Sequence, residues 1–491
     1  MGDHLGSLQE LPIHLLQEIL SNGQLSAADL ARLEASCYTF RASYGFLPCK
    51  FKTMPELAAF QSCLADAMFS AMPLSCRTEL LNRCGDNWKL VLRFLQSVRQ
   101  AFGSVETSKG NVQVTTGKYH TLLVEDGSLY SCGSSICGVL GHGQEITQCG
   151  SLTRAELPLG LTVNHVSGSH NHAAFVTQAG EVFTWGDNSS FCCGHGEVGC
   201  VIFRPMQIQA LKGIICKQVA TGLSYTVILT KYGQVYTCGN NSHGQLGHGD
   251  TLERSIPRKV ERFNSLGPVF QIAAGVSHTM AVTEDGTLYT FGSGSNFCLG
   301  HGEPRDELQP RAVQSFKRKN IHVIRVSAGD EHAVALDSSG YVYTWGKGYC
   351  GALGHGDEID KTTPELLTTI KEHRSVQVCA RKRKTFVLSD DGLVFGFGWM
   401  GFGSLGFVDR GISDKVVSPQ VLETLKGYHV SQISTGLYHT VAVTNKGLVF
   451  GFGDNERAQL GQDSLRQCLE PREIKMRDIS EEEPEMVMSS L

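Results

Sequence analysis

From about residue 112 onward, the chain repeats short stretches of aliphatic and aromatic residues that are bounded by glycine. Residues 182–185 (Val-Phe-Thr-Trp), 288–291 (Leu-Tyr-Thr-Phe) and 342–345 (Val-Tyr-Thr-Trp) place an aromatic residue at every second position. Because successive side chains of a β-strand point to opposite sides, the aromatic residues face one side and the aliphatic residue faces the other. Both faces of such sheets need burial, which the stacked blades of a propeller provide.

Glycines mark the same unit seven times. The first marker is a turn glycine before each aromatic strand, at Gly127, Gly180, Gly233, Gly286, Gly340, Gly392 and Gly447. The second closes that strand, at Gly133, Gly186, Gly239, Gly292, Gly346, Gly398 and Gly453. The third follows leucine or cysteine at steps of 52–55 residues, at Gly141, Gly194, Gly247, Gly300, Gly354, Gly406 and Gly461. Three markers in register predict a mainly β fold, a seven-bladed β-propeller over residues 112–476.

The repeat also has a characteristic turn, Gly-x-x-His, which occurs at residues 117–120, 275–278, 329–332 and 436–439. With the Trp-Gly strand ends and the loop Gly-Gln-Leu-Gly-His-Gly-Asp at residues 244–250, it resembles the regulator-of-chromosome-condensation repeat family. There is no Trp-Asp dipeptide and no Gly-Gly doublet, which disfavours WD and kelch repeats. The resemblance implies the propeller fold, but the fold hosts several unrelated activities.

Before residue 112 the apolar residues follow a helical period. One face of a first helix contains Leu11, Leu15, Leu16, Ile19 and Leu20, and a second helical stretch after Ser26, a candidate N-cap, contains Leu30 and Leu33. Residues 11–41, opening with Leu-Pro, resemble an F-box, although Ser36 and Phe40 stand where that family has valine and tryptophan. The resemblance implies binding to a Skp-type adaptor of a cullin ligase, through Leu11, Pro12, Leu15, Leu16, Ile19, Leu20, Leu30 and Leu33. The alternative is a plain helical cap packed on the propeller.

These patterns divide the chain into four parts. We expect an F-box-like helical domain at 1–50, a helical linker at 51–111 ending in a polar hinge at 102–111, the propeller at 112–476, and a disordered acidic tail at 477–491. Each repeat also contains a proline followed three residues later by an apolar residue. The last such segment, residues 472–476, has no later repeat to pair with, so we expect it to join the strands of the first repeat and close the ring.

Composition narrows the classes of function. The net charge of −5 does not suggest a general nucleic-acid binder. The 17 cysteines are odd in number and contain no Cys-x-x-Cys pair, so we expect reduced thiols in the cytoplasm or nucleus, without metal or cofactor. No signal peptide and no apolar run long enough to span a membrane is visible.

Two basic runs interrupt the repeats, Lys317-Arg318-Lys319 and Arg381-Lys382-Arg383-Lys384. Because they belong to adjacent repeats, they could form one basic patch for an acidic partner or nucleic acid; the alternative is a solvated rim.

Two series of histidines recur once per repeat and are expected to be structural. The loop series is His142, His195, His248, His301 and His355, and one residue per blade spreads around a ring too wide for a shared metal ion. The series at strand starts, His120, His172, His278, His332 and His439, is expected to hydrogen-bond the backbone. No nucleophile-elbow pattern and no P-loop is present, so we expect no enzyme.

The favoured function is therefore a substrate receptor of a Skp-cullin-F-box ubiquitin ligase, with the propeller binding an unknown protein target. The alternatives are an exchange factor for a Ran-type GTPase, for which no long wedge-like insertion is visible, and a chromatin-associated scaffold. A plant ultraviolet-B receptor of this fold has tryptophans where this chain has Leu223, Val276 and Asp330, which excludes that photochemistry.

Overall fold

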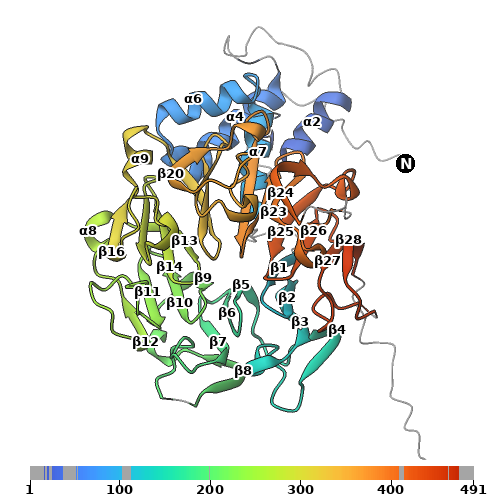
Figure 1. Cartoon of the computed structure of the whole chain (residues 1–491). Helices are drawn as coiled ribbons and strands as arrows, with labels where there is room; N and C mark the ends of the chain where they lie inside the picture. Colours follow the sequence, from blue (N-terminus) through green and yellow to red (C-terminus); the bar gives the residue numbers. More distant parts are fainter. Residues whose placement is uncertain are drawn as a thin grey trace, which may run out of the picture.

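The computed structural model describes residues 16, 19–20, 25–36, 51, 53–101, 112–197, 199–407, 414–462 and 464–474. Its main body consists of seven four-stranded antiparallel sheets arranged around a ring (Figure 1). This confirms the seven-bladed β-propeller that the glycine spacing predicts.

Each blade consists of four strands that follow one another in the chain, and the first three blades run from residue 112 to residue 259. Blade one contains β1 (Val112–Thr116), β2 (His120–Glu125), β3 (Ser128–Ser134) and β4 (Gln148–Arg154). Blade two contains β5 (Val163–Gly168), β6 (His172–Thr177), β7 (Val182–Asp187) and β8 (Val201–Gln207). Blade three contains β9 (Cys216–Thr221), β10 (Tyr225–Thr230), β11 (Val235–Gly239) and β12 (Arg254–Lys259).

The remaining four blades have the same order of strands. Blade four contains β13 (Val269–Ala274), β14 (His278–Thr283), β15 (Leu288–Gly292) and β16 (Glu307–Ala312). Blade five contains β17 (Val323–Ala328), β18 (His332–Asp337), β19 (Val342–Gly346) and β20 (Lys361–Leu366). Blade six contains β21 (Ser375–Arg381), β22 (Lys384–Ser389), β23 (Val394–Trp399) and β24 (Lys415–Val421). Blade seven contains β25 (Val430–Thr435), β26 (His439–Thr444), β27 (Val449–Gly453) and β28 (Cys468–Glu473).

Burial follows the position of a strand within its blade. Every residue of β6, β10, β14, β18, β22 and β26 is buried, because these strands lie between two others and their sheets lie between two blades. The proline-containing strands, such as β8 and β12, form the rim, and they contain exposed and half-buried residues as well as buried ones (Figure 1). A strand without a paired neighbour on one side tolerates proline, which has no amide hydrogen to donate.

The expected closure of the ring by strand exchange is wrong. The last proline-led strand, β28, pairs with β27 of its own blade, as shown by Phe450 opposite Glu473 and Gly451 opposite Arg472. No sheet among the described residues contains strands from both ends of the propeller. The proline-led strand pairs with the strand before it, so the first and last blades share no sheet.

The two ends of the blades define two faces of the ring. The loop face carries the turn after each innermost strand, such as Lys382-Arg383 between β21 and β22, and the long loops between third and fourth strands. The helix face carries the turns after the second strands and the connections between blades, including the short helices α8 (Phe263–Leu266) and α9 (Gln314–Arg318).

Five helices precede the propeller in the described part of the chain: α2 (Ala27–Ser36), α4 (Met54–Ala65), α5 (Ala67–Ala71), α6 (Leu74–Arg83) and α7 (Trp88–Gln100). Four of these helices begin after a residue whose side chain caps the N-terminus: Ser26, Thr53, Asp66 and Asn87. The hydroxyl of Ser26 accepts a hydrogen bond from the amide of Asp29, as its N-cap role requires. Thr53 accepts one from the amide of Glu56, and Pro55 follows in the first turn of α4.

The helices pack on the helix face beside blades five and six, at the top of Figure 1. Arg83 donates hydrogen bonds to the carbonyl oxygens of Ser339 and His373 and stacks over the ring of Tyr341 at 3.8 Å. Arg93 forms an ion pair with the buried carboxylate of Asp390. One apolar core joins α2, α4 and α7 to strands of blades five to seven. Residues 53–101 therefore form helices that pack between α2 and the propeller.

The hinge expected at 102–111 and the tail expected at 477–491 lie outside the described residues. In the part of the chain that the structure describes, no helix is both long enough and apolar enough to cross a bilayer.

Candidate functional site

A ring of seven polar side chains surrounds the central channel, one from the innermost strand of each blade. Its members are Gln113, His165, Gln218, Gln271, Arg325, Gln377 and Gln432, and they line a cavity of about 150 Å³. Sequence reasoning missed this ring, although a polar residue recurs at the repeat spacing inside otherwise apolar strands.

Most of the glutamines link one blade to the next. The amide group of Gln218 donates to the carbonyl oxygen of Ile272 and accepts from its backbone amide, at 3.1 and 3.2 Å. Gln271 makes the same two hydrogen bonds to the backbone of Val326, and Gln377 makes them to the backbone of Ile433. Each such side chain thus replaces part of the backbone pairing that separate sheets lack.

The same kind of bond closes the ring. The side-chain oxygen of Gln432 in blade seven accepts a hydrogen bond from the amide of Val114 in blade one at 3.0 Å. The hydroxyl of Ser434 accepts one from the amide of Thr116. The ring of Tyr438 stacks on that of Tyr119 at 5.6 Å. These side-chain contacts, together with a backbone hydrogen bond from the amide of Leu437 to the carbonyl oxygen of Gly117 at 3.1 Å, join the two ends in place of the expected exchanged strand.

Blade five has Arg325 where most blades have glutamine, and the contacts of Arg325 explain the difference. Its guanidinium donates to the carbonyl oxygen of Val98, in the last turn of α7, at 2.8 Å. Ala101, which follows α7, lines the channel cavity. A helix C-terminus carries partial negative charge, so a cation is favoured there. The end of α7 is thus held at the helix-face mouth of the channel.

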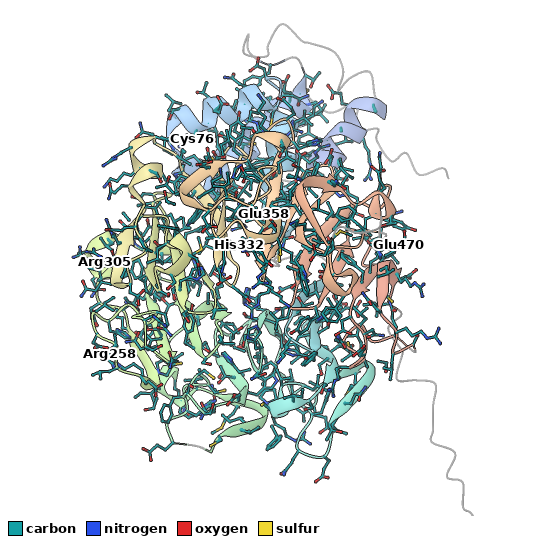
Figure 2. The ribbon with its side chains drawn as sticks, in the orientation of Figure 1. Cys76, Arg258, Arg305, His332, Glu358 and Glu470 are labelled. Atoms are coloured by element: carbon teal, nitrogen blue, oxygen red, sulfur yellow. The ribbon has the colours of Figure 1, made fainter. Side chains whose placement is uncertain are left out.

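A second ring explains the Gly-x-x-His-Thr motif. The Nε2 atom of His172 lies 3.0 Å from the hydroxyl of Thr226 in the next blade, and His332 and Thr385 are paired in the same way at 2.9 Å. His439 and Thr121 form this pair across the closure of the ring, also at 2.9 Å. We call this contact the His–Thr clasp. Figure 2 shows His332 near the middle of the ring, whereas Arg258, Arg305 and Glu470 lie at its rim.

The threonine fixes the direction of the hydrogen bond in the clasp. The hydroxyl of Thr121 donates its only hydrogen to the carbonyl oxygen of Gln459 at 2.6 Å, and Thr385 donates in the same way to Ala352. The histidine Nε2 must therefore carry the hydrogen that it shares with the threonine. The expected backbone hydrogen bonds are present for His332, with Lys382, and for His439, with His120, and the side-chain partner in the neighbouring blade adds to them.

Four blades lack a complete His–Thr clasp. In blade three Tyr225 replaces the histidine, and its hydroxyl lies 3.2 Å from that of Thr279 in blade four. The residues opposite His120 and His278 are Ala173 and Ala333, which have no hydroxyl, and Nε2 of both histidines has no partner among the described residues. In blade six Lys384 replaces the histidine, is fully buried, and its Nζ has no described partner. Burial lowers the pKa of Lys384 well below its usual value.

The loop histidines have structural partners within their own blades. Nε2 of His142 lies 2.8 Å from the hydroxyl of Ser131, and His195, His248, His301 and His355 contact a threonine in the same way. Among the described residues no three metal-binding side chains are arranged to hold an ion.

The loop face carries a group of aromatic and cationic side chains from blades five, six, seven and one. Nζ of Lys382 lies 3.9 Å from the ring centre of Trp399 and 4.2 Å from that of Tyr438, and Phe402 meets Tyr438 edge to face. The guanidinium of Arg383 lies over Tyr349 at 4.7 Å. We call Tyr119, Tyr349, Lys382, Arg383, Trp399, Phe402 and Tyr438 the aromatic–cation cluster. Tyr349 and Phe402 are nearly half exposed, at 49% and 43%.

The structure separates the two predicted basic runs. Lys317 and Arg318 lie in α9, before the start of β17, and are exposed on the helix face with Lys319. Lys382 and Arg383 form the turn after β21, on the loop face, and Arg381 and Lys384 beside them are buried. Because innermost strands of neighbouring blades run in the same direction, the two runs are about one strand length, roughly 20 Å, apart.

The predicted adaptor residues occupy different environments. Leu16, Leu20 and Leu30 are buried in the apolar core of the helices, whereas Ile19 is 47% exposed and Leu33 is partly buried. Leu25, Asp29, Arg32 and Leu33 line a surface pocket of about 320 Å³ on α2. Leu11, Pro12 and Leu15 lie outside the described residues.

Profiles of the regulator of chromosome condensation (RCC1) repeat match residues 179–229, 232–282, 285–336, 339–388 and 391–443. A second profile of this repeat matches residues 216–245, 271–298, 323–352 and 430–459.

Three known proteins illustrate the similarity. The ultraviolet-B receptor UVR8 of Arabidopsis thaliana is 35% identical over 350 residues, which are 71% of this chain and 78% of the receptor. The human E3 ubiquitin-protein ligase HERC2 is 34% identical over 299 residues, 60% of this chain but only 6% of the ligase. The structure of Prp20p from Saccharomyces cerevisiae has a TM-score of 0.64 at 21% identity and covers 73% of this chain and 87% of Prp20p, which shows the shared fold.

Proposed function

Because this chain belongs to the RCC1 repeat family, and its propeller is a protein-interaction module, we propose that it is the substrate-receptor subunit of a Skp-cullin-F-box ubiquitin ligase. In this proposal the N-terminal helices bind a Skp-type adaptor, the loop face of the propeller binds the target protein, and the chain itself catalyses no reaction.

One observation carries the proposal: the two candidate binding surfaces lie on opposite faces of one rigid ring. The helices pack on the helix face at blades five to seven, where Arg83, Arg93 and the shared apolar core fix them. The aromatic–cation cluster lies on the loop face, where it stays available to a second protein. A receptor needs this separation, because the ligase and the target must be held at the same time.

The composition of the cluster supports protein binding. Tyrosine, tryptophan and arginine dominate the residues that contribute most to protein–protein affinity. Here four blades contribute such residues to one surface, and cation–π contacts hold Lys382 and Arg383 in place before a partner arrives. Side chains that are already ordered lose little conformational freedom on binding.

The proposed adaptor surface contains fewer of these leucines than the sequence resemblance implies. Leu16, Leu20 and Leu30 stabilise the helices from inside, so an adaptor would contact the exposed side of Ile19 and the pocket around Leu33. The family resemblance adds Leu11 and Pro12 to this surface. A buried leucine side chain contributes about 1.5–3 kcal/mol, so two or three such contacts give substantial affinity.

Binding of a purified Skp-type adaptor to the intact chain tests this assignment. We expect Leu33→Asp and Leu11→Asp to weaken binding at least a hundredfold, because each places a charge in an apolar interface. The matched control is Leu74→Asp, since Leu74 lies on α6 of the same helices and is 78% exposed. No adaptor binding by the intact chain, or equal loss in the Leu74 variant, would refute the ligase assignment.

A further inference from the structure

Arg381 occupies a position that the other blades give to glycine or serine. Its counterparts after the innermost strands are Gly117, Ser169, Gly222, Gly275, Gly329 and Gly436. A Cβ atom at Gly436 would lie 2.2 Å from the carbonyl oxygen of Gly117, and one at Gly117 would lie 2.3 Å from that of Ser169. Neighbouring blades thus approach too closely here for a side chain to fit between them, and a long one must extend toward the channel.

The guanidinium of Arg381 acts on residues from three blades on the other side of the ring. Burial lowers the pKa of His120 in blade one and of His170 in blade two to about 3, and the positive charge of Arg381 contributes to both shifts. It also acts on Tyr225 in blade three. None of these blades adjoins blade six, so the charge of Arg381 acts across the loop-face end of the channel.

This cation is buried without a counter-ion. Arg381 is 7% exposed, and no carboxylate of the described residues lies within ion-pair distance of it. Its Nε and Nη2 atoms are buried and have no acceptor among those residues. Both nitrogens of His120 and Nε2 of His170 are also without a described partner. A buried charge without a partner is costly, so its presence calls for a ligand.

The unpartnered atoms have a particular geometry. Nε and Nη2 carry the two parallel N–H bonds on one edge of the guanidinium plane, and this edge binds two oxygens of a single carboxylate or phosphate. The neutral imidazole of His120 can donate one further hydrogen bond. The site therefore offers three donors and a positive charge in a buried setting.

We propose that the loop-face mouth of the central channel is a binding site for an oxyanion, a carboxylate or a phosphate on the target protein, and that Arg381 binds it in bidentate fashion. This inference rests on the proposed function in one respect, namely that the anion is presented by a protein. The aromatic–cation cluster adjoins the mouth through Lys382 and Tyr438, so one peptide segment can contact both.

The anion site can be tested without any partner protein. The midpoint of thermal unfolding of the full chain is measured against rising sodium acetate, sodium phosphate or sodium chloride at constant ionic strength. Three variants are compared with the intact chain. Arg381→Met removes the charge and retains the stem, Arg381→Gly restores the residue of five other blades, and Arg318→Met removes an exposed arginine on the helix face.

We expect a saturable rise of the midpoint with acetate or phosphate, about 2 °C at ten times the dissociation constant, in the intact chain and in Arg318→Met only. If the midpoint rises with acetate alone, the ligand is a carboxylate. If it rises with phosphate alone, the ligand is phosphorylated. If it rises with both anions, the site accepts either oxyanion. A rise of equal size in the Arg381 variants, or no saturable rise, would overturn the proposal. Because the assay contains no adaptor and no target, either result leaves the ligase assignment to its own test.

Discussion

The substitution Lys384→His is expected to stabilise the propeller, because it completes the clasp between blades six and seven. Lys384 is fully buried with no described partner for its ammonium group, and the residue at this position in five other blades is histidine. Thr440, in the position of the clasp threonine, already donates its hydrogen to the carbonyl oxygen of Ser404 at 2.8 Å. Its oxygen also accepts a hydrogen bond from the hydroxyl of Thr435 at 2.8 Å, which leaves one lone pair to accept a hydrogen from the new imidazole.

Two effects contribute to the expected gain. Removal of a buried donor without a partner is worth about 1–3 kcal/mol, and the new hydrogen bond adds about 0.5–1.5 kcal/mol. With an unfolding entropy of about 2.1 cal/mol/K per residue, a gain near 3 kcal/mol raises the midpoint of a domain of this size by about 3–4 °C. Differential scanning calorimetry of the intact chain and the variant measures this shift.

A third variant separates the two effects. Lys384→Met removes the ammonium group without providing a clasp, so the difference between the histidine and methionine variants isolates the new hydrogen bond. The pH dependence supplies a further check. Because burial lowers the pKa of Lys384 in the folded chain, the unfolded chain binds the proton more tightly, and the stability of the intact chain rises as the pH increases toward 10.5. The advantage of Lys384→His should shrink over the same range. A lower midpoint for Lys384→His than for Lys384→Met would refute the assignment of the clasp.

Three further predictions follow from the contacts between blades and from the proposed function. Gln432→Ala should lower the free energy of unfolding by about 1–3 kcal/mol in chemical denaturation, because the amide of Val114 loses its buried partner, whereas Tyr232→Ser at an exposed turn should change it little. Circular dichroism should show that the propeller loses stability as the pH falls from 6.5 toward 4, because burial holds the pKa values of His120 and His332 near 3 and the unfolded chain binds those protons first. The purified chain should not accelerate release of bound nucleotide from a Ran-type GTPase, and a catalytic acceleration would favour the exchange-factor alternative.

The number of blades was predictable because glycines mark each turn at a position that other residues fill poorly. Gly186 has φ 106°, and a Cβ there would lie 2.4 Å from the carbonyl oxygen of Asn171, so the glycine at this strand end is required by the backbone. Such local requirements repeat in every blade and are therefore visible in one sequence.

Ring closure was not predictable from the same reasoning. Each proline-led strand has an antiparallel neighbour available on either side of it in the chain, and loops of similar length connect it to both. Only the structure shows that it pairs with the preceding strand and that Gln432 and His439 bridge the remaining gap.

The candidate site was only partly accessible from the sequence. One basic run lies before an innermost strand and the other lies after one. Because the two ends of an innermost strand lie on opposite faces of the ring, the two runs are on opposite faces. The aromatic–cation cluster combines turns and loops of four blades, so no single motif contains it. Within the F-box resemblance, sequence cannot separate leucines that stabilise the helices, such as Leu30, from those with an exposed side, such as Leu33.

Quantitative affinity purification with mass spectrometry tests the central claim, that two faces bind two partners independently. The proteins recovered with the intact chain are compared with those recovered with Leu33→Asp, with Tyr349→Ser on the loop face, and with Tyr232→Ser, a tyrosine that is 72% exposed on the helix face at blade three. The account predicts that Leu33→Asp loses the Skp-type adaptor and cullin but retains the other partners, that Tyr349→Ser retains the adaptor and loses at least one other partner, and that Tyr232→Ser loses neither. Loss of both groups together in either variant, or of neither in both, would contradict it.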